Sequence, residues 1–163
     1  MTKKKIVKLS LFVVGIGIIV AVSIALYLFN MPHRDVQATA ADFTYTASEI
    51  VQEYLADSEK ANEKYLDEEG ESKILQVSGM VSSISEDFNH QKVVLLKNDN
   101  DPAGVSCTFT QETNDGVTNV SIGSQITVKG VIRSGATYDD DLGMYEHVIM
   151  EKCKIISYKE SNH

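Results

Sequence analysis

The side chains that could do chemistry in this chain are mostly carboxylates, and they gather in two polar segments. The first is Asn98–Asp101, and the second is formed by Asp139, Asp140 and Asp141. Carboxylate and amide oxygens bind Ca²⁺, but neither segment has the ligand spacing and the distal Glu of a calcium loop. Asn and Asp also favour turns, because their side chains hydrogen-bond to the local backbone. We therefore expect two turns and no metal site.

No catalytic group of residues can be assembled from the rest of the sequence. It has no Gly-x-Ser-x-Gly, no phosphate-binding glycine loop and no His-Glu-x-x-His. Only His147 of the four histidines falls in an expected strand, where it reads as an outward or edge residue. Two cysteines with His147 as the nearest histidine do not make a four-ligand zinc site. The sequence therefore predicts that the protein is not an enzyme and carries no cofactor.

The charge of the chain argues against a polyanionic partner. It has 23 acidic and 15 basic residues, and four of the bases are lysines among residues 1–8. The remaining 11 bases face all 23 acids after Asn30, which gives that part a formal charge of −12. Single-stranded nucleic acid is the alternative partner, and binding it would require Lys92, Lys97, Lys129 and Arg133 to form one positive stripe.

An uncharged apolar stretch of 21 residues, Leu9–Phe29, follows the N-terminal lysines. As a helix it would span about 31 Å, close to the hydrocarbon thickness of a bilayer. The positive-inside bias then places a basic tail, residues 1–8, in the cytoplasm and the chain after Asn30 outside. We expect a single-pass protein of the cell (inner) membrane that contacts the lipid bilayer through residues 9–29, with an extracytoplasmic or periplasmic C-terminal domain.

A cleaved signal peptide is the rival interpretation, because Ala38-Thr39-Ala40 has the form of a cleavage site. The apolar stretch is longer than the usual signal core of about 7–15 residues, which favours an uncleaved anchor. No cysteine lies among residues 15–40, so the sequence excludes a lipoprotein acylated just after the signal core.

A linker over residues 30–45 leads to the clearest helix start in the chain. Thr46-Ala47-Ser48-Glu49 is a capping box, in which the Thr hydroxyl and the Glu carboxylate satisfy exposed amides, so the helix should begin at Ala47. Apolar residues then recur at helical spacing as far as Tyr65, with charged residues on the opposite side. We predict one amphipathic helix over residues 46–66.

Strand-like alternation replaces the helical pattern over residues 73–159. Gly79 and Gly130 interrupt the first and fourth of five runs, and a glycine inside a strand marks a bulge or a bend. Five strands with bends in the first and fourth predict a mainly β domain, a five-stranded Greek-key barrel of the OB-fold type. The five runs are Ile74–Ile84, Lys92–Lys97, Val105–Thr110, Gln125–Arg133 and Tyr145–Tyr158.

Several segments of the chain together resemble the tRNA_anti-like family. They are Met31-Pro32-His33-Arg34-Asp35-Val36, Ala41-Asp42-Phe43-Thr44, Asn62-x-Lys64-Tyr65-Leu66, Val77-Ser78-Gly79-x-Val81, Gly104-Val105-Ser106-Cys107-Thr108-Phe109 and Ile126-Thr127-Val128-Lys129-Gly130, with Cys153 later. The resemblance covers nearly all of the chain after the membrane helix. It implies a small bacterial protein with an N-terminal membrane segment, a helix and an OB-fold barrel, and it brings no catalytic residues. The segment Ser134–Glu146 is longer and more acidic than the family pattern.

Cys107 and Cys153 are the only cysteines, and they fall in the third and fifth expected strands. The topology that the resemblance implies makes these strands neighbours. An oxidising compartment and an even cysteine count favour a disulfide. Cys107 also fits a small buried hydrophobe between Val105 and Phe109, and bridging two strands requires a narrow range of distances. Both interpretations stay open.

OB barrels bind ligands on the face of their second and third strands and on the flanking loops. In this chain that region holds Lys92–Lys97, Val105–Thr110 and the loop Ser134–Glu146. We therefore expect a membrane-anchored binding or adaptor module of the cell envelope, with a protein, peptide or glycan as its partner. The candidate binding residues are Lys92, Lys97, Asp139, Asp140 and Asp141.

Overall fold

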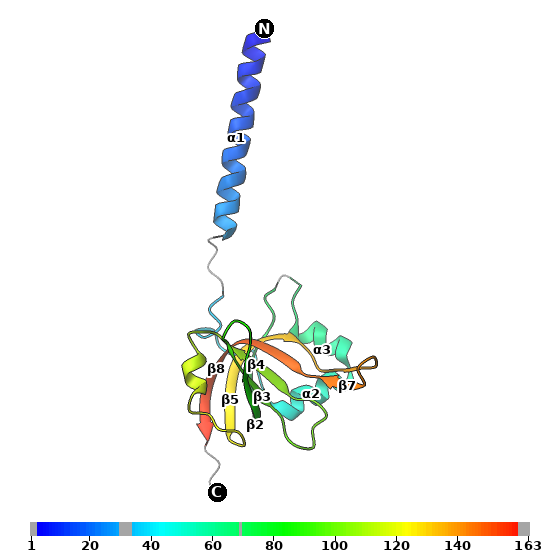
Figure 1. The fold of residues 1–163 in the computed structure, drawn as a ribbon. Coiled ribbons are helices and arrows are strands. Elements are labelled where there is room, and N and C mark those ends of the chain that lie inside the picture. The colour runs from blue at the N-terminus through cyan, green and yellow to red at the C-terminus, as the bar shows by residue number, and fades with distance from the viewer. Residues whose placement is uncertain (1–2, 30–33, 69, 160–163) are drawn as a thin grey trace. The chain divides into compact units, whose positions relative to one another are not determined.

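The computed structural model describes residues 3–29, 34–68 and 70–159, and the chain divides into two units after Arg34 (Figure 1). The first unit holds the helix α1 (Lys3–Phe29), which includes all four lysines that were expected in a separate tail. Side chains of α1 are described for residues 14–27, and all the large apolar ones among them are exposed. No helix within the described residues is long and apolar enough to cross a membrane.

The second unit begins at Asp35, within the segment of residues 30–45 that we expected to be a linker. Residues 30–33 lie outside the described residues, but the rest of the segment is attached to the barrel. Lys129 Nζ donates hydrogen bonds to the backbone oxygens of Gln37, at 2.8 Å, and Thr39, at 3.1 Å. The strand β1 (Phe43–Thr46) then pairs in parallel with β2 (Ile74–Glu86). The linker prediction was therefore wrong for residues 43–45, because the alternating pattern of a strand cannot be recognised over only four residues.

Two helices, α2 (Ala47–Ala56) and α3 (Ser58–Tyr65), replace the single predicted helix. The capping box is confirmed: the Thr46 hydroxyl accepts from the Glu49 amide, and the Glu49 carboxylate accepts from the Thr46 amide. Asp57 divides the helices, because its amide bonds to the Glu53 carbonyl while its carboxylate accepts from the Lys60 amide, at 3.0 Å. One residue thus ends α2 and caps α3.

A closed barrel of five strands follows, which confirms the mainly β, OB-like architecture. Its order is β2, β3 (Lys92–Leu96), β4 (Val105–Phe109), β8 (Val148–Lys159) and β5 (Gln125–Ser134), and β5 pairs back with β2. The pair β4–β8 is parallel, and the other pairs are antiparallel. Apolar side chains from all five strands fill the interior and pack against α2 and α3.

The two strand glycines lie where neighbouring segments come very close. A Cβ atom at Gly130 would lie 2.6 Å from Cys153 Sγ, and the β5–β8 register shifts between Lys129 and Val131. A Cβ atom at Gly79 would lie 3.0 Å from the Cβ atoms of Ala47 and Leu96, near the point where β2 changes partner from β5 to β3. Both glycines therefore allow a long strand to curve into a closed barrel.

The segment Ser134–Glu146 is not a plain loop. It contains a hairpin of β6 (Thr137–Asp139) and β7 (Met144–Glu146), so the fifth barrel strand begins at Val148 and not at the predicted Tyr145. A short 3-10 helix, η1 (Asn114–Val117), lies between β4 and β5.

Candidate functional site

The outward side of β3 and β4 is the binding region that the OB topology predicts, and the structure defines which residues form it. Val94 and Leu96 are buried, whereas Val93 and Leu95 are partly exposed, so the latter two face outward. In the same way β4 buries Cys107 and turns Ser106 and Thr108 outward. We call this surface the outer β3–β4 face. Cross-strand partners complete it as a set of seven: Ser83, Ser85, Val93, Leu95, Ser106, Thr108 and Ile149.

The outer β3–β4 face presents only hydroxyl and aliphatic side chains. None of its seven residues is charged and none is aromatic. It therefore offers no ring on which a base could stack and no cation for a phosphate. Hydroxyls beside small aliphatic groups suit a surface that forms hydrogen bonds with a neutral partner and excludes water around them.

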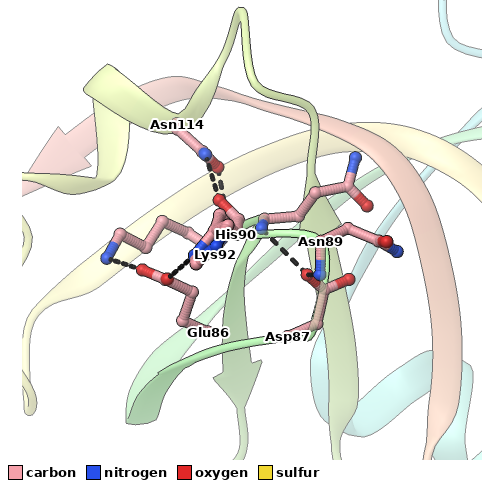
Figure 2. A network of polar contacts seen from close by, with 7 residues as sticks. Glu86, Asp87, Asn89, His90, Lys92 and Asn114 are labelled. Carbon is pink, nitrogen blue, oxygen red and sulfur yellow. Dashed lines mark hydrogen bonds and ion pairs between the residues drawn. The ribbon is translucent and has the colours of Figure 1, made fainter.

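The β2–β3 loop at one end of this face is held in a fixed shape by a polar network, shown in Figure 2. The Glu86 carboxylate contacts His90 Nδ1 and accepts from Lys92 Nζ, both at 2.7 Å. Asn114 donates to the His90 carbonyl and accepts from the Lys92 amide, which ties the loop to η1. His90 has a φ of +59°, a left-handed conformation that is uncommon outside glycine.

Phe88 lies in this ordered loop with its side chain fully exposed. The Asp87 carboxylate accepts hydrogen bonds from the amides of Asn89 and Gln91, so the backbone on both sides of Phe88 is fixed. Sequence reasoning did not select Phe88, because a single aromatic residue in a polar loop has no pattern.

The basic residues do not form the stripe that nucleic-acid binding would require. Lys92 pairs with Glu86, and Arg133 pairs with Glu151 at 2.9 Å. Lys129 is engaged by backbone oxygens of the N-terminal segment. Lys97 follows β3 at the end opposite to Lys92, so the two candidate lysines are not brought together.

The acidic candidates are used in turns, as the sequence analysis predicted. The Asp139 carboxylate accepts from the amides of Asp141 and Leu142 in the β6–β7 turn, and Asp140 and Asp141 are exposed. In the other segment, the Asp101 carboxylate accepts from the Ser48 hydroxyl at 2.6 Å and so links that loop to α2. Within the part of the chain that the structure describes, no group of three or more His, Cys, Asp or Glu residues could hold a metal ion.

Cys107 and Cys153 are both completely buried, and both carry free thiols in this structure. Burial raises the pKa of the Cys153 thiol, and the neighbouring Cys107 raises it further. A buried, protonated thiol is a poor nucleophile and a poor metal ligand. The predicted adjacency of the two cysteine strands is confirmed, because β4 pairs with β8.

His147 lies between β7 and β8 and is half-buried, not in an outward strand position. Its Nδ1 accepts a hydrogen bond from the Gly104 amide at 3.1 Å, so this ring nitrogen must be unprotonated. Burial lowers the pKa of His147, and the positive charge of Lys97 lowers it further. This histidine therefore joins two loops of the fold.

An aromatic box that could receive a cation is already filled by the chain itself. Lys64 Nζ lies 5.2, 5.4 and 4.7 Å from the ring centroids of Phe43, Tyr45 and Tyr65. The same ammonium pairs with Glu53 at 2.7 Å. The cluster joins β1 to both helices, and we assign it to stability.

Comparisons with known proteins agree with this fold. The model of the tRNA_anti-like family matches residues 1–141. A crystal structure from Klebsiella pneumoniae, described as a "putative nucleic acid-binding lipoprotein", is similar with a TM-score of 0.53 at 18% identity, over 78% of this chain and 100% of that chain. An asparaginyl-tRNA synthetase from Entamoeba histolytica, in complex with asparaginyl-adenylate, matches 54% of this chain and 22% of its own, at 14% identity and a TM-score of 0.37. No curated protein sequence matches the chain. At 18% identity, the first structure supports a shared fold and nothing more specific.

Proposed function

The chain belongs to the tRNA_anti-like family, and from this premise we propose that it is a membrane-anchored binding or adaptor module of the cell envelope, without enzymatic activity. Its OB-like barrel binds a protein, peptide or glycan on the outer β3–β4 face. The observation that carries this proposal is the absence of charged and aromatic side chains from the seven residues of that face, in a domain that is strongly acidic.

Anchoring rests on the apolar stretch of residues 9–29. Its described large side chains are all exposed in α1, so nothing within the first unit covers them. A surface of this kind requires an apolar environment, and the lysines before it favour a cytoplasmic N-terminus. The chain has no cysteine before Cys107, so the lipid attachment named for the Klebsiella protein is not part of this proposal.

Binding of single-stranded nucleic acid is the alternative, and the description of the Klebsiella protein favours it. Against it stand the pairing of Lys92 and Arg133 with carboxylates and the use of Lys129 within the fold. An OB domain that binds single strands combines a positive groove with stacking rings, and binding weakens steeply as salt rises.

A matched pair of variants tests the proposed face. We expect Leu95→Glu to abolish crosslinking of the full-length protein to its partner in native membranes, because it places a charge in the centre of the outer β3–β4 face. Ile122→Glu introduces the same charge at a position that is 66% exposed and is not one of the seven residues of the face, and it should crosslink like the wild type. Circular dichroism must show that both variants fold. Loss of crosslinking in both variants, or in neither of them, contradicts the proposal.

A fluorescence anisotropy titration separates the two partner classes. We expect no binding of labelled single-stranded DNA or RNA by the full-length protein at about 50 mM salt, where electrostatic binding would be strongest. Binding that is lost at about 200 mM salt would instead establish the nucleic-acid alternative.

A further inference from the structure

A cleft of about 520 Å³ lies at the junction of α2 and α3, beside the β6–β7 hairpin. Its lining comes from the end of α2, the start of α3 and the hairpin. This volume is in the range of pockets that hold small ligands or single side chains. The outer β3–β4 face contributes no residue to this cleft, so a ligand site here is independent of the proposed function.

Three tyrosine rings form the walls of this tyrosine cleft. Tyr138 and Tyr145 pair across the hairpin in an edge-to-face arrangement, with ring centroids 4.9 Å apart and an interplanar angle of 61°, and they are 48% and 38% exposed. Tyr54 is buried beneath them, against the chain at Gly135. A Cβ atom at Gly135 would overlap the Tyr54 ring, so the glycine is what allows this ring to reach the hairpin.

The Tyr54 hydroxyl has no hydrogen-bond partner among the described residues, although it is buried. Burial raises the pKa of Tyr54 to about 12, so the phenol stays protonated and can both donate and accept. An unsatisfied buried hydroxyl costs free energy that a partner would recover. The hydroxyl oxygen is itself closed off from solvent, so Tyr54 supports the lining of the cleft and its phenol oxygen is not open to a ligand.

The charge of the lining selects the class of ligand. Asp57 and Glu59 contribute carboxylates, and no lysine, arginine or histidine lines the cleft. The amide ends at the start of α3 are positive, but Asp57 already caps them. Exposed phenol faces beside carboxylates attract cations and repel anions.

We propose that the tyrosine cleft binds an organic cation, either a free polyamine or the lysine or arginine side chain of a peptide. The ammonium or guanidinium group lies against the faces of Tyr138 and Tyr145 and near the Glu59 carboxylate. A neutral sugar and an inorganic anion each lack the charge that this lining recognises.

The first experiment is isothermal titration of the full-length protein in micelles of octaethylene glycol dodecyl ether, which carries neither sugar nor charge. The probes are spermidine, the tripeptide Ac-Gly-Arg-Gly-NH2 and the neutral sugar maltotriose. We expect one of the two cations to bind, more weakly at higher salt, and maltotriose not to bind. The cation that binds more tightly identifies the source of the ligand. Absence of cation binding, or equal binding of maltotriose, overturns the proposal.

Two substitutions on one helix separate a local effect from general electrostatics. Glu59→Gln should weaken cation binding about two- to fivefold, as expected for one exposed charge next to the ligand. Glu63→Gln removes the same charge one turn further along α3, outside the lining, and should leave the affinity within error of the wild type. An equal effect of the two substitutions would mean that only the net charge of the domain attracts the cation.

Discussion

His147 shows at the scale of one residue how the surroundings decide the role of a titratable group. As a free imidazole it would titrate near 6.5, but its Nδ1 must stay unprotonated to accept from the Gly104 amide. The folded-state pKa is lowered, so the unfolded chain takes up a proton at a higher pH than the folded chain does. Stability is therefore fully present above about 6.5 and is lost as pH falls through the folded-state pKa.

We accordingly expect the free energy of unfolding to decrease when the pH is lowered from 7.5 to about 5.5, a range above the ordinary pKa of carboxylates. Urea unfolding at several pH values measures this slope. His147→Asn removes the titrating ring and should flatten the slope. An equally steep slope in the variant would assign the pH dependence to other groups.

The distance along the chain between a residue and its partners explains which candidate residues could be assigned from the sequence. Local side-chain chemistry correctly assigned Asp139 to a turn, because the atoms that it bonds lie within three residues. The partners of Lys129 and Arg133 are about 90 and 18 residues away, so no local pattern could show that these bases are engaged. The position of the Tyr54 ring was missed for the same reason, since the ring packs against Gly135, far along the chain.

At the scale of the element, long and regular patterns were readable and short ones were not. The capping box placed the start of α2 at Ala47. Alternation of apolar and polar residues located both ends of each of the five barrel strands to within about three residues. The strand β1 and the β6–β7 hairpin were missed because runs of three or four residues carry no measurable period. The break at Asp57 was missed because the apolar spacing continues across it from α2 into α3.

The bend of β5 lies at Gly130, and a substitution there tests whether the bend requires glycine. Gly130→Ala would bring a Cβ atom to 2.6 Å from Cys153 Sγ and 2.9 Å from the Glu151 carbonyl oxygen, and neither strand can move without opening the barrel. We expect a loss of about 2 kcal/mol in the free energy of unfolding, measured by urea titration. Gly116→Ala is the control, because a Cβ atom there meets nothing within 4 Å. A Gly130→Ala protein as stable as the Gly116→Ala protein would mean that the bend does not depend on the glycine.

At the scale of the whole molecule, closure of the barrel brings together the residues of both candidate surfaces. No single segment of the chain contains either surface. The outer β3–β4 face combines residues of β2, β3, β4 and β8, and the tyrosine cleft combines the helices with the hairpin between β5 and β8. The sequence indicated the region of the face through the OB topology. It could not show that the face would lack cations, because that depends on where each long basic side chain finds a partner.

The uncharged stretch over residues 9–29 predicts that the protein resides in a membrane. We expect the full-length protein to stay in the membrane pellet after extraction at alkaline pH, and a reporter enzyme fused after residue 163 to be active only outside the cytoplasm. Replacing Ile18 and Ile19 with Arg should release the protein from the pellet, because each charge at the centre of a bilayer costs about 3 kcal/mol on insertion scales. Ile156→Arg is the control, an exposed apolar position in β8, and it should stay in the pellet. A mature protein that mass spectrometry shows to begin near residue 40 would instead establish the signal-peptide interpretation, since cleavage there removes the whole apolar stretch.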